Sequence, residues 1–202
     1  MQFAPTAQQK AEPHNMLKNL TLELSFISHS IYQKRMSSGI SIQSSSEPKR
    51  KDLVSPNIAD YRHSVKSRVR SYDVDRQSIV HNAVYLYWLE AARIEYFRTI
   101  GLPLDFQTFV TKHRFVVAHV EVDYFYAARF DEEYEILTRV PYINNSSFGF
   151  EQIVRLLDGT ILLTANAVMV HLNPASHKPE RIADSYRKLI RDYEGEHVVI
   201  SE

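Results

Sequence analysis

Cysteine is absent from the 202-residue chain, glycine is scarce at five residues, and the formal net charge is zero. The lack of cysteine excludes disulfides, thiolate metal sites and a cysteine nucleophile. The few glycines form no GxGxxG fingerprint, no phosphate-binding P-loop and no GxSxG nucleophile elbow. The balance of 24 basic and 24 acidic side chains gives no sign of a nucleic-acid partner.

Long apolar runs are missing too, and none approaches the roughly 20 residues that a membrane-spanning helix needs. No signal-peptide core begins the sequence, which argues against secretion. The nine histidines form no HExxH motif and have no other spacing that demands a metal. We therefore expect no membrane span, no metal and no cofactor, and a cytoplasmic protein, with organelle import through residues 1–55 left open.

Composition divides the chain. Residues 1–70 hold 11 of the basic and 5 of the acidic side chains, and "MSSGISIQSSSEPKRKD" is rich in serine and charge. Such a segment buries too little apolar surface to offset its ordering entropy. We predict a disordered extension over residues 1–58, with a weak amphipathic helix over 14–33, one domain over 59–195 and a tail over 196–202.

Hydrophobic periodicity predicts one long helix and an antiparallel sheet, an α+β fold. Gly101 and Pro103 end the helix, and Asp158-Gly159 predicts a tight hairpin between the last two strands. A short helical turn is expected in residues 105–113. The predicted strands cover residues 63–72, 115–127, 134–141, 148–157 and 160–172, and the predicted helices cover 83–100 and 180–193.

The long helix is apolar over most of its surface, with charged residues on two arcs. Glu95 and Arg98 fall on the arc that we predict to be exposed. Glu90 and Arg93 fall on the opposite arc, three residues apart, where side chains meet. They form a structural ion pair, or else Glu90 borders a ligand site.

Two acids, Asp73 and Asp75, precede this helix. On an extended segment, residues two apart point to the same side. The first turn of a helix presents free N–H groups and favours negative charge, so it is a suitable place to hold an oxyanion. A carboxylate beside such a site can attack or hydrate an activated acyl group. The simpler interpretation of an acid before a helix is a cap.

The residues from Tyr72 to Arg93, "YDVDRQSIVHNAVYLYWLEAAR", carry a closer signal. They resemble the 4-hydroxybenzoyl-CoA thioesterase family of hotdog-fold enzymes, including the YbgC-like acyl-CoA thioesterases. The family pattern reads Asp-x-Asp-x-x-Gly-[Ile/Val]-Val-x-[His/Asn]-x-x-Tyr, followed by Glu-x-x-Arg. The residues that fall on it without a gap are Asp73, Asp75, Ile79, Val80, Asn82, Tyr85, Glu90 and Arg93.

The resemblance implies a hotdog fold, in which an antiparallel sheet wraps around one long helix. It also implies a homodimer or homotetramer with shared active sites, and an acyl-CoA or acyl carrier protein substrate. Asp75 matches the catalytic nucleophile or general base, and the Asn82 N–H matches the donor to the thioester carbonyl. The residues implied to bind substrate, more loosely in the case of the two serines, are Asp73, Ser78, His81, Tyr85, Glu90, Ser146 and Ser147.

One position departs from the pattern, because Ser78 stands where the family has glycine. If the loop requires positive φ there, serine costs on the order of 1–2 kcal/mol. The leading hypothesis is an acyl-CoA thioesterase. The alternatives are an acyl carrier protein thioesterase, suggested by the likeness of "HNAVY" to "NNAVY" of plant enzymes, and a hotdog domain that binds acyl thioesters without turnover.

Overall fold

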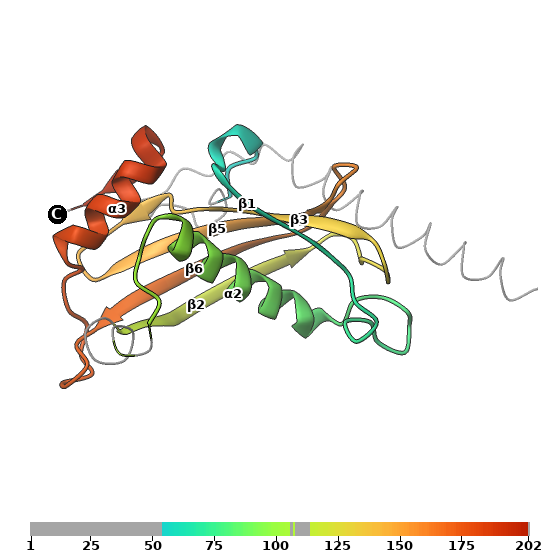
Figure 1. Cartoon of the computed structure of the whole chain (residues 1–202), viewed down its shortest axis with the longest axis horizontal. Coiled ribbons are helices and arrows are strands. Elements are labelled where there is room, and N and C mark those ends of the chain that lie inside the picture. Colours follow the sequence, from blue (N-terminus) through green and yellow to red (C-terminus); the bar gives the residue numbers. More distant parts are fainter. Residues whose placement is uncertain (1–53, 106, 108–113, 202) are drawn as a thin grey trace, which may run out of the picture. The chain divides into compact units, whose positions relative to one another are not determined.

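A seven-stranded sheet with one long helix against it organises the protein (Figure 1). The computed structural model describes residues 54–105, 107 and 114–201, all within one compact unit, Pro48–Glu202. The predicted helix over 14–33 and most of the predicted turn over 105–113 lie outside the described residues. The elements are η2 (Ile58–Asp60), β1 (His63–Arg68), α2 (Asn82–Thr99), β2 (Arg114–Tyr124), β3 (Glu133–Arg139), β4 (Tyr142–Ile143), β5 (Ser147–Leu156), β6 (Ile161–Leu172), α3 (Asp184–Glu194), η4 (Gly195–His197) and β7 (Val199–Ile200).

Five long strands run antiparallel in the order β1-β3-β5-β6-β2. The short β4 pairs with the start of β5, and β7 pairs with β4 in parallel. The predicted hairpin joins β5 to β6. Its Gly159 has a φ of +96°, and the Thr160 N–H binds the Asp158 carboxylate at 2.8 Å. The five predicted strands are therefore present, and two short strands add to the sheet.

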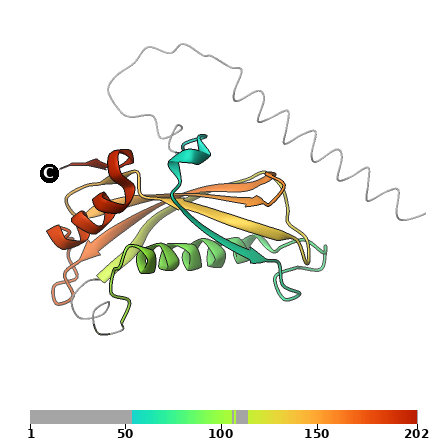
Figure 2. The same ribbon diagram turned by 45° about the horizontal axis from the view of Figure 1, so that its top comes forward.

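Helix α2 runs along one face of the sheet (Figures 1 and 2). It ends at Thr99, two residues before Gly101, whose φ of +78° lets the N–H groups of Gly101 and Leu102 bind the carbonyls of Arg98 and Phe97. This is the glycine-terminated C-cap that the sequence predicts. Helix α3 lies at the end of the sheet where α2 finishes, and the Tyr96 hydroxyl donates to Glu194 Oε1 across 2.7 Å.

Two apolar clusters fill the space between α2 and the sheet. The first surrounds the N-terminal half of α2, where Trp88 stacks on Tyr134 with ring centroids 4.0 Å apart. The second surrounds the C-terminal half, where Tyr96 and Phe97 meet the aromatic rings of β2, β5 and α3. The core between α2 and the sheet thus consists of two clusters, and both include residues of this one helix.

The arcs of α2 differ partly from the prediction. Arg98 and Thr99 are exposed as expected, and Glu95 is half-exposed. The opposite arc is mixed: Arg93 is buried, whereas Glu90 is exposed. The reason is that the sheet covers one side of α2, so side chains that the helical wheel places together meet different surroundings along its length.

Candidate active site

The loop before α2 is a small hairpin. Val74 and Val80 face each other in an antiparallel bridge, and the Asp75 N–H donates to the Ile79 carbonyl at 2.8 Å. The Ser78 N–H donates to the Asp75 carbonyl at 3.0 Å, which closes a three-residue loop of the type that ends in a left-handed residue. Ser78 has a φ of +61°, so it adopts the conformation that a glycine would take without strain.

Asp75 sits at the start of this turn and is half-buried. Its Oδ1 accepts the Gln77 N–H at 2.7 Å, which fixes the carboxylate against the turn. Its Oδ2 has no hydrogen-bond partner among residues 54–105, 107 and 114–201. One oxygen therefore orients the group, and the other is available to a substrate or a water molecule.

Asp73 occupies a different setting, and the prediction of an extended segment with both acids on one side is wrong. Asp73 lies in a turn, is 6% exposed, and accepts the Arg70 N–H on Oδ2 at 2.8 Å. Its carbonyl accepts the His81 N–H at 2.9 Å. The Asp73 carboxylate closes its own turn, and its backbone holds the residue just before α2.

The first turn of α2 leaves the backbone donor of Asn82 open. His81 is the N-cap, its Nδ1 accepts the Ala83 N–H at 3.2 Å, and its carbonyl accepts the Val84 N–H at 2.9 Å. The Asn82 N–H has no acceptor within the described part of the chain. This amide also lies at the positive end of the helix dipole. His81 and Asn82 are both exposed, so an anion can approach the open amide.

Tyr85 supports the helix start from inside. It is 2% exposed, and its hydroxyl accepts the Ala128 N–H at 2.9 Å. The Ala128 carbonyl in turn accepts the Val80 N–H at 2.8 Å. Burial raises the pKa of Tyr85 above its usual value of 10. Tyr85 thus joins α2, the hairpin before it and the segment after β2 into one unit.

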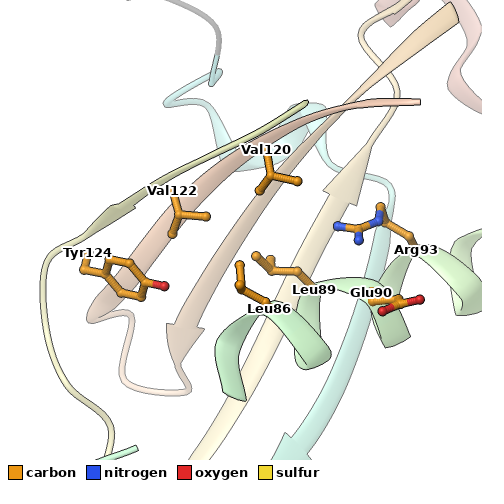
Figure 3. A pocket seen from close by; sticks show the side chains of 7 residues that line it. All are labelled: Leu86, Leu89, Glu90, Arg93, Val120, Val122 and Tyr124. Carbon is orange, nitrogen blue, oxygen red and sulfur yellow. The ribbon is translucent and has the colours of Figure 1, made fainter. Parts of the chain in front are cut away.

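A groove of about 380 Å³ opens between α2 and the edge strand β2 (Figure 3). Leu86 and Leu89 form its helix side, and the Tyr124 hydroxyl donates to the Asn82 carbonyl across 3.0 Å at the helix start. One lining residue of the groove, Tyr124, therefore contacts the residue that carries the open amide. The lining residues are Leu86, Leu89, Glu90, Arg93, Val120, Val122 and Tyr124.

Arg93 and Glu90 lie at the helix side of this groove (Figure 3). The Arg93 guanidinium donates to Gln152 Oε1 at 2.9 Å, so the predicted contact with Glu90 is replaced by a buried neutral amide. Burial lowers the pKa of Arg93, and the negative charge of Glu90 partly opposes this effect. Glu90 lines the groove. The second interpretation of this pair, that Glu90 borders a ligand site, stays a prediction.

Ser146 and Ser147 lie at the other end of the sheet. Ser147 pairs with Val170 of β6, whereas Tyr124, beside the helix start, pairs with Leu163. The two pairs lie seven positions apart along β6, roughly 23 Å at 3.3 Å per residue. Within one chain, the two serines do not join the site around Asp75.

Metal ligands and membrane-spanning helices are not found in the described part of the chain. Among the described residues, no group of three or more histidine and acidic side chains could hold a metal ion. Likewise, none of the helices described is long and apolar enough to cross a membrane.

Known proteins are similar to this chain. The family model described as "Thioesterase superfamily" matches residues 77–163. The acyl-CoA thioesterase YbgC of Haemophilus influenzae is 34% identical over 115 residues, which cover 56% of this chain and 82% of that protein. The chain belongs to the thioesterase superfamily. This membership confirms the resemblance, the hotdog fold and the enzyme class, a thioester hydrolase.

Further relatives of this thioesterase-superfamily protein include a structure of a Thermus thermophilus thioesterase complexed with coenzyme A and Zn. It is 31% identical to this chain, with a TM-score of 0.59. The match covers 67% of this chain and 96% of that one. A chloroplastic acyl-acyl carrier protein thioesterase of Arabidopsis thaliana is 23% identical over 126 residues, which are 62% of this chain and 65% of that protein.

Two site contacts escape sequence reasoning. The sequence places Tyr124 among ordinary sheet aromatics, although its alternation with Val120 and Val122 puts all three on one strand face. Its bond to the Asn82 carbonyl joins residues 42 positions apart, and no local pattern signals it. The Arg93–Gln152 hydrogen bond joins residues 59 positions apart, and no local pattern signals it either.

Proposed function

We propose that this protein hydrolyses acyl-CoA thioesters, with Asp75 as the catalytic carboxylate and the Asn82 N–H as the oxyanion donor. The observation that carries the proposal is the open Asn82 amide at the start of α2, in one hairpin–helix unit with the free Oδ2 of Asp75. The coenzyme A part of the substrate is inferred from the 34% identical YbgC protein, which is named an acyl-CoA thioesterase.

The chemistry follows from these groups. The thioester oxygen accepts the Asn82 N–H, and the helix dipole stabilises the negative charge that develops on this oxygen. The acyl chain occupies the groove, whose walls are mainly Leu86, Leu89, Val120 and Val122. The carbon–sulfur bond then breaks, and coenzyme A leaves as its thiolate.

Asp75 has two possible roles that share this geometry. As a nucleophile it forms a mixed anhydride, which water then hydrolyses; as a general base it removes a proton from the attacking water. An unlabelled product acid from a single turnover in heavy-oxygen water would identify the nucleophilic route. General-base catalysis always labels the product acid, whereas an unlabelled acid in the first turnover requires transfer of an Asp75 oxygen.

A second copy of the chain completes the site in this proposal. Strand β2 is 11 residues long and pairs with β6 along one edge, and none of the described strands pairs with its other edge. Long free edges favour strand addition. Antiparallel pairing of two β2 edges brings the Ser146–Ser147 side of one sheet toward the Asp75 side of its partner. Sedimentation velocity is expected to show a dimer or a larger even assembly.

A second candidate substrate is an acyl carrier protein thioester. The observation that favours it is the 23% identity to the chloroplastic protein of Arabidopsis thaliana that is named an acyl-acyl carrier protein thioesterase. The two substrate classes share the acyl group and the thioester, so they are separated by kcat/KM on coenzyme A and carrier-protein forms of one acyl chain.

The decisive experiment measures thiol release from a panel of short, long and aromatic acyl-CoA thioesters. We expect hydrolysis of at least one member, and a loss of on the order of a hundredfold or more in Asp75→Asn, because this change removes the anionic oxygen but keeps the side-chain size. The measurement is kcat/KM alongside thermal unfolding, which checks that the variant is folded.

The matched control is Asp192→Asn, at a solvent-exposed acid on α3 that pairs with Lys188. It is expected to keep full activity. If Asp75→Asn also keeps full activity, the catalytic assignment is wrong although the family remains. A folded wild type that binds acyl-CoA but hydrolyses no panel member supports the binding-domain alternative instead.

A further inference from the structure

We propose that Tyr124 is a positioning residue, which holds the oxyanion donor of Asn82 in place from the neighbouring strand. This inference rests on the proposed function, because it assigns a role within that site. It starts from one contact: the Tyr124 hydroxyl donates to the Asn82 carbonyl across 3.0 Å, joining the last residue of β2 to the first residue of α2.

The start of a helix needs such support. The first residues of a helix have no partners for their N–H groups and are the first to fray. In α2 the neighbouring N–H groups are held by His81, but the Asn82 N–H is left open for a ligand. The Tyr124 hydrogen bond fixes Asn82 through its carbonyl and leaves this N–H available.

Tyr124 is itself well held. Its ring meets the Tyr85 ring edge-on, with centroids 5.8 Å apart, and Tyr85 is bonded to Ala128. Burial raises the pKa of Tyr124 above 10, so its hydroxyl stays protonated and remains a donor at neutral pH. Tyr124 therefore links the sheet to the helix start, and its ring packs against a second tyrosine.

Tyr124 also faces the groove (Figure 3). Among the seven lining residues, it is the one whose side chain hydrogen-bonds to the helix start within the described part of the chain. An acyl chain in the groove thus contacts the same ring that orients the oxyanion donor. Small displacements of a donor of this kind lower the rate of the chemical step more than they weaken substrate binding.

The test compares Tyr124→Phe with Tyr126→Phe in the full-length protein, using an acyl-CoA that the wild type hydrolyses. Both variants lose one phenolic hydroxyl from a partly exposed tyrosine, and no hydrogen bond of the Tyr126 hydroxyl is found among the described residues. We expect kcat of Tyr124→Phe to fall roughly three- to tenfold, the value of one hydrogen bond, with KM within about twofold. Tyr126→Phe should match the wild type.

A second readout is independent of turnover. Amide hydrogen exchange of a peptide covering residues 81–86 should be faster in Tyr124→Phe and unchanged in Tyr126→Phe. An active wild type with an unchanged Tyr124→Phe, in kcat or in exchange, overturns the positioning role and leaves the proposed function standing. A wild type that hydrolyses no acyl-CoA overturns the proposed function, and with it the catalytic meaning of Tyr124.

Discussion

The two ends of α2 lie in different surroundings. At the C-terminal end, Tyr96 and Phe97 are 0% and 2% exposed and packed among aromatic rings. At the N-terminal end, Leu86 and Tyr87 are 44% and 70% exposed, and the Asn82 amide is open. One helix therefore has a tightly packed end and a more open end, and the open end is where we propose that the chemistry takes place. Binding sites are commonly placed on the less tightly packed end of a rigid element.

The largest expected effect is at the packed end. Phe97→Ala removes a ring that touches Phe115, Phe148 and Phe150, and it should lower the free energy of unfolding by about 3–5 kcal/mol. Phe130→Ala is the matched control, because that ring is 58% exposed in the loop before β3. It should change stability by less than about 0.5 kcal/mol.

Urea unfolding measures both variants. Equal losses in the two would contradict the stabilising role of the packed end of α2. The folded fraction of Phe97→Ala should also keep its kcat, since the substituted ring lies away from the open amide. A large drop in kcat of the folded fraction would show that the two ends are coupled.

A smaller effect on stability is expected in the hairpin before the N-terminal end of α2. Ser78 has a φ of +61°, so Ser78→Gly should raise the free energy of unfolding by about 1 kcal/mol. Ser78→Ala separates conformation from chemistry, because it removes the hydroxyl but keeps the steric cost of the left-handed conformation. We expect no gain in Ser78→Ala; a gain equal to that of glycine would show that backbone conformation is not the cause.

The smallest effect is a pH dependence at the packed end. His63 is 6% exposed and meets the Tyr96 ring edge-on. Burial lowers its pKa below the usual 6.5, although the charge of Glu95 partly opposes this shift. The folded state therefore favours the neutral ring, and its contribution to stability is full above pH 6.5 and lost as the pH falls toward the folded-state pKa.

His63→Phe tests this, since phenylalanine keeps a ring beside Tyr96 but cannot titrate. Between about pH 7.5 and about pH 5.5, the melting temperature of the wild type should fall more than that of the variant. Parallel pH profiles in the two proteins would exclude His63 as the source of the slope.

Much of the fold could be predicted from local patterns. The helix end at Gly101 and the Asp158-Gly159 hairpin follow from backbone preferences of single residues, which act over a few positions. The sequence raised a positive φ at position 78 only as a condition, and the structure has it there. The environment of Asp73 was mispredicted because a side chain that closes its own turn is indistinguishable, in sequence, from one on an extended segment.

The groove could not be predicted in the same way. Its walls come from α2 and β2, whose placement against each other no local pattern fixes, and its polar contacts at Tyr124 and Arg93 depend on how the helix lies on the sheet. The roles of Asp75 and Asn82 stay predictions, since they depend on a bound substrate.

The most direct test of the central claim is a crystal structure of Asp75→Asn with an acyl-CoA substrate bound. The account predicts the thioester oxygen about 2.7–3.1 Å from the Asn82 nitrogen, the acyl chain in the groove between α2 and β2, and position 75 facing the thioester carbon or a water beside it. A thioester bound away from the start of α2, with the Asn82 amide facing only solvent, would contradict it.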